Sequence, residues 1–170
     1  MAAPSKPVYS IAMICMGNIC RSPTAEAVLR HKLRLAGLDR WVDVSSAGTH
    51  DYHAGSPPDR RSVAHGGKRG YDFSGQKADH VGPVHFRDCD LLLAMDWDNL
   101  ELLQERCPPE YQHKLKRLME FAPEAGSDIV PDPYYGGPAA FDHVLDLVEA
   151  ACDGLVAHLQ LQLGERPRNA

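Results

Sequence analysis

The sequence lacks a long apolar segment and an excess of basic charge. No apolar run in its 170 residues is long enough to span a bilayer, and residues 1–7 lack the apolar centre that a signal peptide needs. Lys and Arg number 18 against 23 Asp and Glu, so the net charge of −5 opposes contact with nucleic acid or an anionic membrane. We therefore expect a cytoplasmic protein with no nucleic-acid or membrane partner.

The sequence lacks the cysteine pattern of a disulfide framework or of a metal site. The five cysteines are scattered along the chain, and their odd number favours a reducing compartment. His50 and His53 lie close in sequence, but no neighbouring set of acids or thiols completes a metal site. We expect both to be exposed loop histidines, and we expect no metal or other cofactor.

The length fits one domain without repeats. A chain of this size buries roughly 70% of the surface that its unfolded form exposes, which is enough for a self-sufficient core. No internal repeat or low-complexity segment interrupts the sequence. We expect one domain over 8–164, with a flexible N-terminus at 1–7 and a flexible C-terminal tail at 165–170.

Hydrophobic patterning predicts alternating strands and helices. Short apolar runs bounded by turn residues predict strands at 8–14, 41–47, 91–95 and 115–121. Apolar residues at helical spacing predict helices at 23–35, from 58 to 65, from an Asp96 cap to 106, and at 138–163. This alternation indicates a parallel sheet with helices on both faces, whose ligands bind beyond the carboxyl ends of the strands.

The turn between the first strand and the first helix carries the strongest functional signal. It consists of Cys15, Met16, Gly17, Asn18, Ile19, Cys20, Arg21, Ser22 and Pro23. The spacing from Cys15 to Arg21 lets the backbone curl round one tetrahedral anion, with N–H groups pointing inward and a helix N-terminus beside it. Gly17 and Asn18 suit the positive φ that a tight loop needs. The segment therefore predicts a phosphate site.

Its side chains suit phosphate transfer to sulfur. A helix N-terminus and a nearby Arg stabilise a thiolate, so we expect Cys15 to be nucleophilic. Arg21 offers a planar fork of donors for two phosphate oxygens. Ser22 is placed to donate a hydrogen bond to the sulfur as it leaves, and Asn18 to tie the loop internally. A merely buried Cys15 would not account for the other residues of this turn.

A proton donor for the leaving oxygen has to come from elsewhere in the chain. Asp132 is the candidate, because it is held between two prolines and is followed by Tyr134 and Tyr135. Asp, Pro and Gly also favour plain surface turns, so this signal gains its weight from the cysteine turn.

With these features the chain resembles the low-molecular-weight protein tyrosine phosphatase family over most of its length. The resemblance rests on the turn 15–23, Ser46 after the second strand, the segment 132–135, the size and the strand order. It implies an α/β three-layer sandwich with a four-stranded parallel sheet in the flavodoxin-like order 2-1-3-4. It also implies Cys15 as nucleophile, Arg21 as phosphate binder, Asp132 as general acid and then base, Ser22 as helper of the leaving thiolate, and Asn18 and Ser46 as loop stabilisers.

The resemblance further implies hydrolysis of phosphotyrosine proteins through a phosphocysteine, with inorganic phosphate and other oxyanions as product-like ligands. Phosphate is expected on Met16, Gly17, Asn18, Ile19, Cys20 and Arg21. An apolar slot for the phenyl ring is expected from Met16, Tyr52, Tyr134 and Tyr135.

Cys20 and Gln76 also bear on the phosphate loop. Cys20 is placed to trap an oxidised Cys15 as a disulfide, although simple packing also accounts for it. Gln76 stands where many relatives carry a His that helps to fasten the phosphate loop.

Three other functions compete with this interpretation. An arsenate reductase of the same fold would need two relay cysteines, for which Cys89 and Cys107 are poorly spaced. A protein arginine phosphatase would tend to have Thr in place of Ile19 and no tyrosine pair after Asp132. A catalytically dead phosphate-binding module would be expected to lose the nucleophile or the acid, and this chain retains both.

Overall fold

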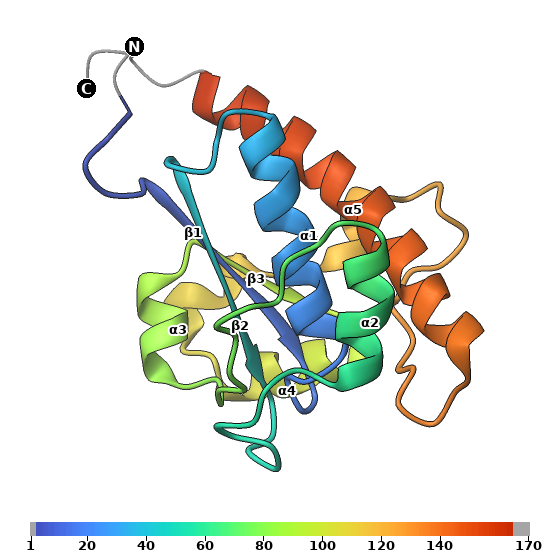
Figure 1. The fold of residues 1–170 in the computed structure, drawn as a ribbon. Coiled ribbons are helices and arrows are strands. Elements are labelled where there is room, and N and C mark those ends of the chain that lie inside the picture. Colours follow the sequence, from blue (N-terminus) through green and yellow to red (C-terminus); the bar gives the residue numbers. More distant parts are fainter. Residues whose placement is uncertain (1–2, 165–170) are drawn as a thin grey trace.

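The centre of the computed structural model, which describes residues 3–164, is a parallel sheet (Figure 1). Its strands are β1 (Tyr9–Cys15), β2 (Val42–Gly48), β3 (Leu91–Ala94) and β4 (Leu115–Arg117). They lie in the order β2-β1-β3-β4, which confirms the expected four-stranded sheet of order 2-1-3-4. The tail expected at 165–170 lies outside the described residues.

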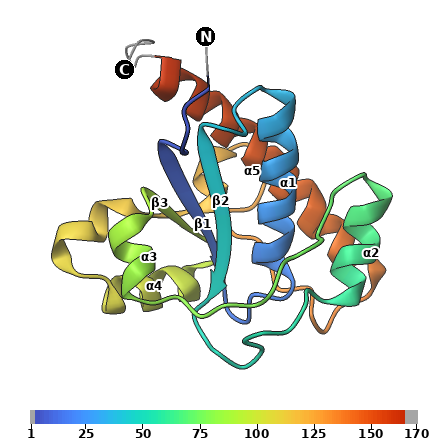
Figure 2. The ribbon, with the colours of Figure 1, turned by 60° about the vertical axis from the view of Figure 1, so that its left-hand side comes forward.

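Helices cover both faces of this sheet. They are α1 (Arg21–Leu35), α2 (Arg60–Lys68), α3 (Pro83–Asp88), α4 (Trp97–Arg106) and α5 (Pro138–Gly164), with short 3₁₀ helices η1 (Pro109–Lys114) and η2 (Leu118–Phe121). Figure 2 shows α1, α2 and α5 on one side of the sheet and α3 and α4 on the other. This arrangement confirms the expected three-layer α/β sandwich. No helix within residues 3–164 is long and apolar enough to cross a membrane.

The central strand β1 contributes to a hydrophobic core on each side. Ile11 and Met13 pack with the core that α1 and α5 cover, whereas Ala12 and Ile14 belong to the core under α3 and α4. Because both faces are buried, the strand is apolar at consecutive positions rather than at alternate ones. The first and last helices each bury an apolar face, namely Ala25, Val28, Leu29 and Leu33 in α1, and Phe141, Val144, Leu145, Val148, Ala151, Leu155 and Leu159 in α5.

The carboxyl ends of the strands create the place for a site. Cys15 is paired with Gly48 where β1 and β2 end. A side chain at Gly48 would put its Cβ 2.6 Å from the Met16 carbonyl oxygen, so only glycine lets the two segments approach this closely. The strand order reverses between β1 and β3, and the loop that follows β1 lies at this switch point.

Two helices start at positions other than the expected ones. The helix expected from 23 begins at Arg21, because the Cys20 carbonyl already accepts hydrogen bonds from the Thr24 N–H at 3.3 Å and the Thr24 hydroxyl at 2.7 Å. The helix expected from 58 begins at Arg60, because the Asp59 side chain caps it by accepting from the Arg61 N–H.

The structure also differs from expectation at the end of β4, at two short helices and at Ser46. The fourth strand ends at Arg117, because the next residues form η2, in which the neighbours Leu118 and Met119 are both buried, as a helical turn allows. Helices α3 and η1 were not expected, because six residues are too few to show a helical period. Ser46 lies inside β2, opposite Met13, and not after the strand.

Candidate active site

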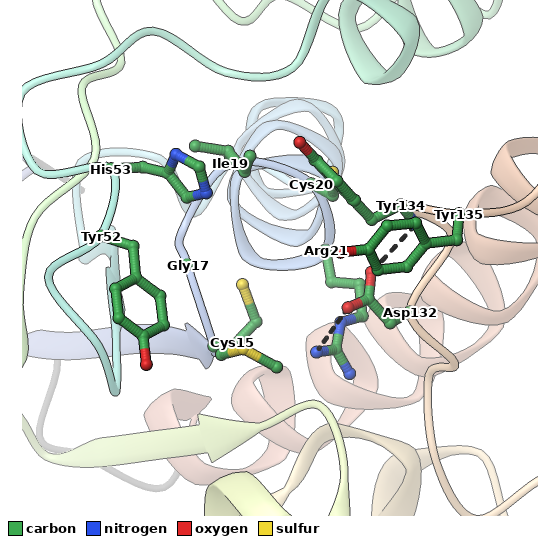
Figure 3. A pocket seen from close by; sticks show the side chains of 11 residues that line it. Cys15, Gly17, Ile19, Cys20, Arg21, Tyr52, His53, Asp132, Tyr134 and Tyr135 are labelled. Atoms are coloured by element: carbon green, nitrogen blue, oxygen red, sulfur yellow. Dashed lines mark hydrogen bonds and ion pairs between the residues drawn. The ribbon is translucent and has the colours of Figure 1, made fainter.

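A cavity of about 280 Å³ opens beside the loop that follows β1 (Figure 3). Three segments far apart in the chain meet there: the loop after β1, the loop after β2 and the segment that precedes α5. The lining residues are Cys15, Met16, Gly17, Ile19, Cys20, Arg21, Tyr52, His53, Asp132, Tyr134 and Tyr135. The tertiary structure thus brings the predicted nucleophile, the predicted phosphate binder and the predicted acid to one cavity.

Backbone hydrogen bonds hold the loop 16–20 by its carbonyl groups. The Thr49 N–H donates to the Cys15 carbonyl at 2.9 Å. The Asp59 N–H donates to the Ile19 carbonyl at 2.8 Å. In a trans peptide the C=O and the following N–H point in opposite directions, so these bonds turn the N–H groups of Met16 and Cys20 away from the supporting segment.

Asn18 shapes the loop from within. It has φ 58° and is the one non-glycine residue with positive φ among residues 3–164. Its buried side chain donates from Nδ2 to Ser22 Oγ at 2.8 Å and accepts at Oδ1 from the Asp79 N–H at 2.9 Å. The expectation of positive φ was wrong for Gly17, which instead leaves room for the His53 ring: a Cβ there would lie 2.9 Å from His53 Cδ2.

Ser22 joins Asn18 to the cysteine sulfur. Ser22 Oγ lies 3.0 Å from Cys15 Sγ, and both side chains are buried. Because Ser22 Oγ accepts a hydrogen bond from Asn18, its own hydroxyl proton is free to point at the sulfur. The arrangement suits a serine that stabilises a thiolate, as the sequence predicts.

Arg21 is held from behind by Asp96, a contact that the sequence analysis missed. Arg21 Nη1 donates to Asp96 Oδ2 at 2.6 Å and to the Val130 carbonyl at 3.0 Å. Burial alone would lower the pKa of this guanidinium, but the Cys15 sulfur and the Asp96 carboxylate raise it on balance, so Arg21 stays charged. Asp96 was predicted only as a helix cap, a role that it also fills by accepting from the Asn99 N–H.

Asp132 stands at the opposite side of the cavity from Tyr52 and His53 (Figure 3). Its Oδ2 is 3.9 Å from Arg21 Nη2, and its side chain is 42% exposed. Its Oδ1 accepts from the Tyr134 N–H at 3.0 Å, which fixes the carboxyl group relative to the backbone of its own loop. One carboxyl oxygen therefore faces the guanidinium while the other is held by the chain.

Apolar and aromatic side chains form the rim. Tyr52 is 71% exposed and Tyr135 is 96% exposed, whereas Met16 and Tyr134 are about half as accessible, at 42% and 38%. His53 lines the cavity as well and was not predicted to do so. His50 and His53 are partly buried rather than exposed, a correction that follows from stacking of His50 on Tyr52 and from packing of His53 on the phosphate loop.

Of the two residues predicted to stabilise the loop, Asn18 contacts it directly and Ser46 does not. Gln76 donates from Nε2 to the Pro23 carbonyl at 3.1 Å. The hydroxyl of Ser46 donates to Glu26 in α1 at 2.8 Å and reaches the loop only through that helix. Asn18, by contrast, contacts both Ser22 and the segment at Asp79.

The remaining cysteines are free and buried. Burial raises the pKa of Cys20 to about 12, with a further contribution from the Asp59 carboxylate. Burial also raises the pKa values of Cys89, Cys107 and Cys152. Cys89 and Cys107 pack in the core under α3 and α4 and do not line the cavity. Residues 3–164 contain no group of three or more His, Cys, Asp or Glu placed to hold a metal ion.

Comparisons with known proteins show the family of this chain. Residues 10–165 match the family described as low molecular weight phosphotyrosine protein phosphatase. A low molecular weight protein-tyrosine-phosphatase of Streptomyces coelicolor is 40% identical over 161 residues, which cover 93% of this chain and 98% of that protein.

Solved structures of phosphatases superpose on this chain. A protein tyrosine phosphatase from Entamoeba histolytica, crystallised with Hepes in its active site, superposes with a TM-score of 0.87 at 37% identity, over 93% of this chain and 99% of that one. A Drosophila arginine phosphatase superposes with a TM-score of 0.82 at 27% identity, over 88% of this chain and 97% of that one. Similar folds therefore carry phosphatases with different named substrates.

Proposed function

The chain belongs to the low molecular weight phosphotyrosine protein phosphatase family, and we propose that Cys15, Arg21 and Asp132 carry its hydrolysis of protein phosphotyrosine. The observation that carries this assignment is the meeting of all three residues in one cavity with an aromatic rim. A nucleophile, a fixed cation and a carboxyl group are the parts that phosphate transfer to sulfur requires.

In the first step, Cys15 Sγ attacks phosphorus in line with the bond to the phenolic oxygen. The S–P bond forms as the P–O bond breaks, and Asp132 gives its proton to the leaving oxygen. Arg21 grips two of the equatorial phosphate oxygens and neutralises their charge. Its buried pairing with Asp96 aims the guanidinium before the substrate arrives.

In the second step, water replaces the tyrosine. The Asp132 carboxylate takes a proton from this water, whose oxygen attacks phosphorus and releases the Cys15 sulfur. The hydroxyl of Ser22, 3.0 Å from Sγ, stabilises the departing thiolate. One carboxyl group thus serves as acid and then as base.

The phosphate itself is bound by the loop 16–21. Donors from outside the loop occupy the Met16 and Ile19 carbonyls, which leaves backbone N–H groups to face an anion beside the N-terminus of α1. The Entamoeba relative holds Hepes, a sulfonate, in its active site. We propose that inorganic phosphate and similar oxyanions bind the loop of this chain.

The aromatic rim selects phosphotyrosine. Met16, Tyr52, Tyr134 and Tyr135 surround the entrance, so a phenyl ring can bury its faces while its phosphate reaches Cys15. Phosphoserine is too short to make both contacts at once. Nucleic acid and membranes are not expected partners, because the chain carries a net charge of −5.

Phosphoarginine is the second candidate substrate. The likeness to a Drosophila arginine phosphatase favours testing it. Ile19 lines the cavity beside Tyr134 and Tyr135, and apolar contacts of this kind suit a phenyl ring better than a charged guanidinium. We therefore place phosphotyrosine first.

The deciding experiment measures phosphate release from matched phosphotyrosine and phosphoarginine peptides in the presence of EDTA, with wild type and Cys15→Ser. Turnover of the phosphotyrosine peptide that resists EDTA and vanishes in the variant is the expected result. Preference for the phosphoarginine peptide would keep the mechanism and overturn the substrate. No turnover of either peptide would move the assignment to arsenate reduction or to phosphate binding alone.

We also propose that the protein works in a reducing compartment such as the cytoplasm. Its five cysteines are free, and the proposed reaction needs Cys15 as a thiol rather than in a disulfide. Cys20 is proposed as the thiol that captures an oxidised Cys15 as a disulfide.

A further inference from the structure

Arg61, in the first turn of α2, touches the cavity wall from outside. It does not line the cavity itself, yet its guanidinium contacts the segment that carries Asp132. The backbone of its partner Asp59 is hydrogen-bonded to the proposed phosphate loop, residues 16–21. The two residues therefore lie between the two halves of the proposed active site.

One end of this connection is fixed to the phosphate loop. The Asp59 N–H donates to the Ile19 carbonyl at 2.8 Å. The Asp59 carboxylate then accepts from Arg61 Nε at 3.1 Å and from Arg61 Nη2 at 2.9 Å. This two-point pairing sets the plane and the direction of the guanidinium, which a single contact would leave free to rotate.

The other end is fixed to the segment of the acid. Arg61 Nη1 donates to the Tyr134 carbonyl at 2.9 Å. The same guanidinium lies 5.3 Å from the Tyr134 ring centre and 4.6 Å from that of Phe141, within the range of cation–π contact. The N–H of the same Tyr134 donates to Asp132 Oδ1 at 3.0 Å. Arg61 is thus one residue removed from the carboxyl group.

We propose that the Asp59–Arg61 pair is a positioning device for the acid, setting the distance between the phosphate loop and the Asp132 carboxyl group. The inference rests on the proposed role of Asp132 as general acid. The pair touches neither the phosphate nor the reacting atoms, so its effect passes through Tyr134. This role needs the planar guanidinium of Arg61. A Lys ammonium is a single point charge and cannot bind the Asp59 carboxylate and the Tyr134 carbonyl in one plane.

The leaving group of the substrate reveals whether the acid is out of place. Phenyl phosphate, like phosphotyrosine, releases a basic phenolate that needs the proton of Asp132. 4-Nitrophenyl phosphate releases a far weaker base and needs that proton much less. A misplaced acid therefore slows the first substrate more than the second, whereas general damage to the fold slows both equally.

The test compares Arg61→Lys and Asp59→Asn with the control Arg69→Lys. Asn at position 59 keeps an N-cap acceptor for α2 while removing the second carboxylate oxygen. Arg69 directly follows α2 as its C-cap but pairs with Asp146 and Glu149 of α5, away from the cavity. The measurements are kcat/KM for both aryl phosphates and the inhibition constant of inorganic phosphate.

We expect Arg61→Lys and Asp59→Asn each to lower kcat/KM for phenyl phosphate about 10-fold, as a small displacement of a catalytic group does. The loss for 4-nitrophenyl phosphate should be much smaller, phosphate inhibition should be unchanged, and Arg69→Lys should leave the ratio of the two substrates at the wild-type value. Equal losses for both substrates, or weaker phosphate inhibition, would overturn the inference.

Asp132→Asn separates this inference from the function on which it rests. It should show the same selective loss for phenyl phosphate, in a larger form. If it does and Arg61→Lys does not, the positioning role is wrong and the acid stands. If Asp132→Asn shows no such selectivity, the assignment of Asp132 is itself wrong, and the positioning role falls with it.

Discussion

Asp96 Oδ2 lies 2.6 Å from Arg21 Nη1, and both side chains are largely buried, with 3% of Arg21 and 20% of Asp96 exposed. A buried charge without its partner is costly, and this carboxylate also caps α4. The orientation of the guanidinium proposed to bind phosphate therefore depends on a residue 75 positions away in the sequence.

Neutralising Asp96 should weaken phosphate binding. Asp96→Asn keeps an N-cap acceptor but removes the charge that holds Arg21, and loss of a charge-assisted hydrogen bond costs about 2 kcal/mol. We expect KM for an aryl phosphate and the inhibition constant of phosphate to rise about 30-fold, since each 1.4 kcal/mol is about tenfold. Steady-state kinetics should show no such change for Asp98→Asn, an exposed acid two residues on. Unchanged phosphate inhibition in Asp96→Asn would mean that Arg21 is positioned by other contacts.

Thiol reagents should find a single cysteine in the native protein. The raised pKa of Cys20, about 12, keeps it as a thiol at neutral pH, and burial does the same for Cys89, Cys107 and Cys152. Iodoacetamide at pH 7 should therefore modify Cys15 alone, and inorganic phosphate should protect it. Peptide mass spectrometry of native and urea-unfolded samples checks both points. Rapid labelling of Cys20 in the native state would contradict the prediction.

Cys20 has a separate, redox role to be tested. Capture of an oxidised Cys15 forms an S–S bond, releases water from the sulfenic acid and needs the Cys20 thiol to lose its proton. The raised pKa of Cys20 makes that step slow at neutral pH and faster as pH rises. We expect peroxide inactivation that dithiothreitol reverses in wild type and does not reverse in Cys20→Ser. Equal recovery of the two proteins would leave Cys20 a packing residue.

Replacing Gln76 should stabilise the protein. Its Nε2 donates to the Pro23 carbonyl, but its Oε1 is buried with no hydrogen-bond partner. An unpaired buried acceptor costs about 1–3 kcal/mol, and Met, which is similar in size to Gln, has no polar oxygen to leave unpaired. We expect Gln76→Met to raise the free energy of unfolding by about 1 kcal/mol in urea titrations, with kcat/KM unchanged. Gln76→Ala, which removes the bulk of the side chain as well, serves as the comparison.

Acid should destabilise the protein through Asp59 and Asp142. A hydrogen bond from Arg61 lowers the pKa of Asp59, and one from His65 lowers the pKa of Asp142. A carboxyl group with a lowered folded-state pKa stabilises the fold above its unfolded value, about 3.9, and loses that contribution as pH falls through the folded value. The free energy of unfolding should therefore fall below about pH 4. Its slope against pH should be smaller in Asp59→Asn, and an unchanged slope would contradict the assignment.

Local features of the site followed from the sequence. The turn from Cys15 to Pro23 combines a strand end, a tight loop and a helix start within a few residues, so its geometry depends on neighbours in the chain. The two helix caps differ in how well the sequence predicts them. Asp96 was predicted as a cap, whereas Asp59 was not, because Pro58 looked like the helix start.

Contacts across the sheet could not be found in this way. Ser46 was expected after a strand and lies within β2, and its hydroxyl faces Glu26 of α1. The entry of His53 into the cavity depends on how the loop after β2 folds back onto Gly17. No periodicity or motif marks such a residue, because its position is set by packing rather than by its neighbours in sequence.

The sequence by itself determined the alternation of strands and helices and pointed to the proposed nucleophile, phosphate loop and general acid, because each depends on residue type and short spacing. Only the tertiary structure decided that Asp96 holds Arg21. It also decided that Asp59 and Arg61 connect the segment of Asp132 to the loop after β1. These contacts join residues tens of positions apart, and long-range packing of α2, α4 and the sheet brings them within hydrogen-bond distance.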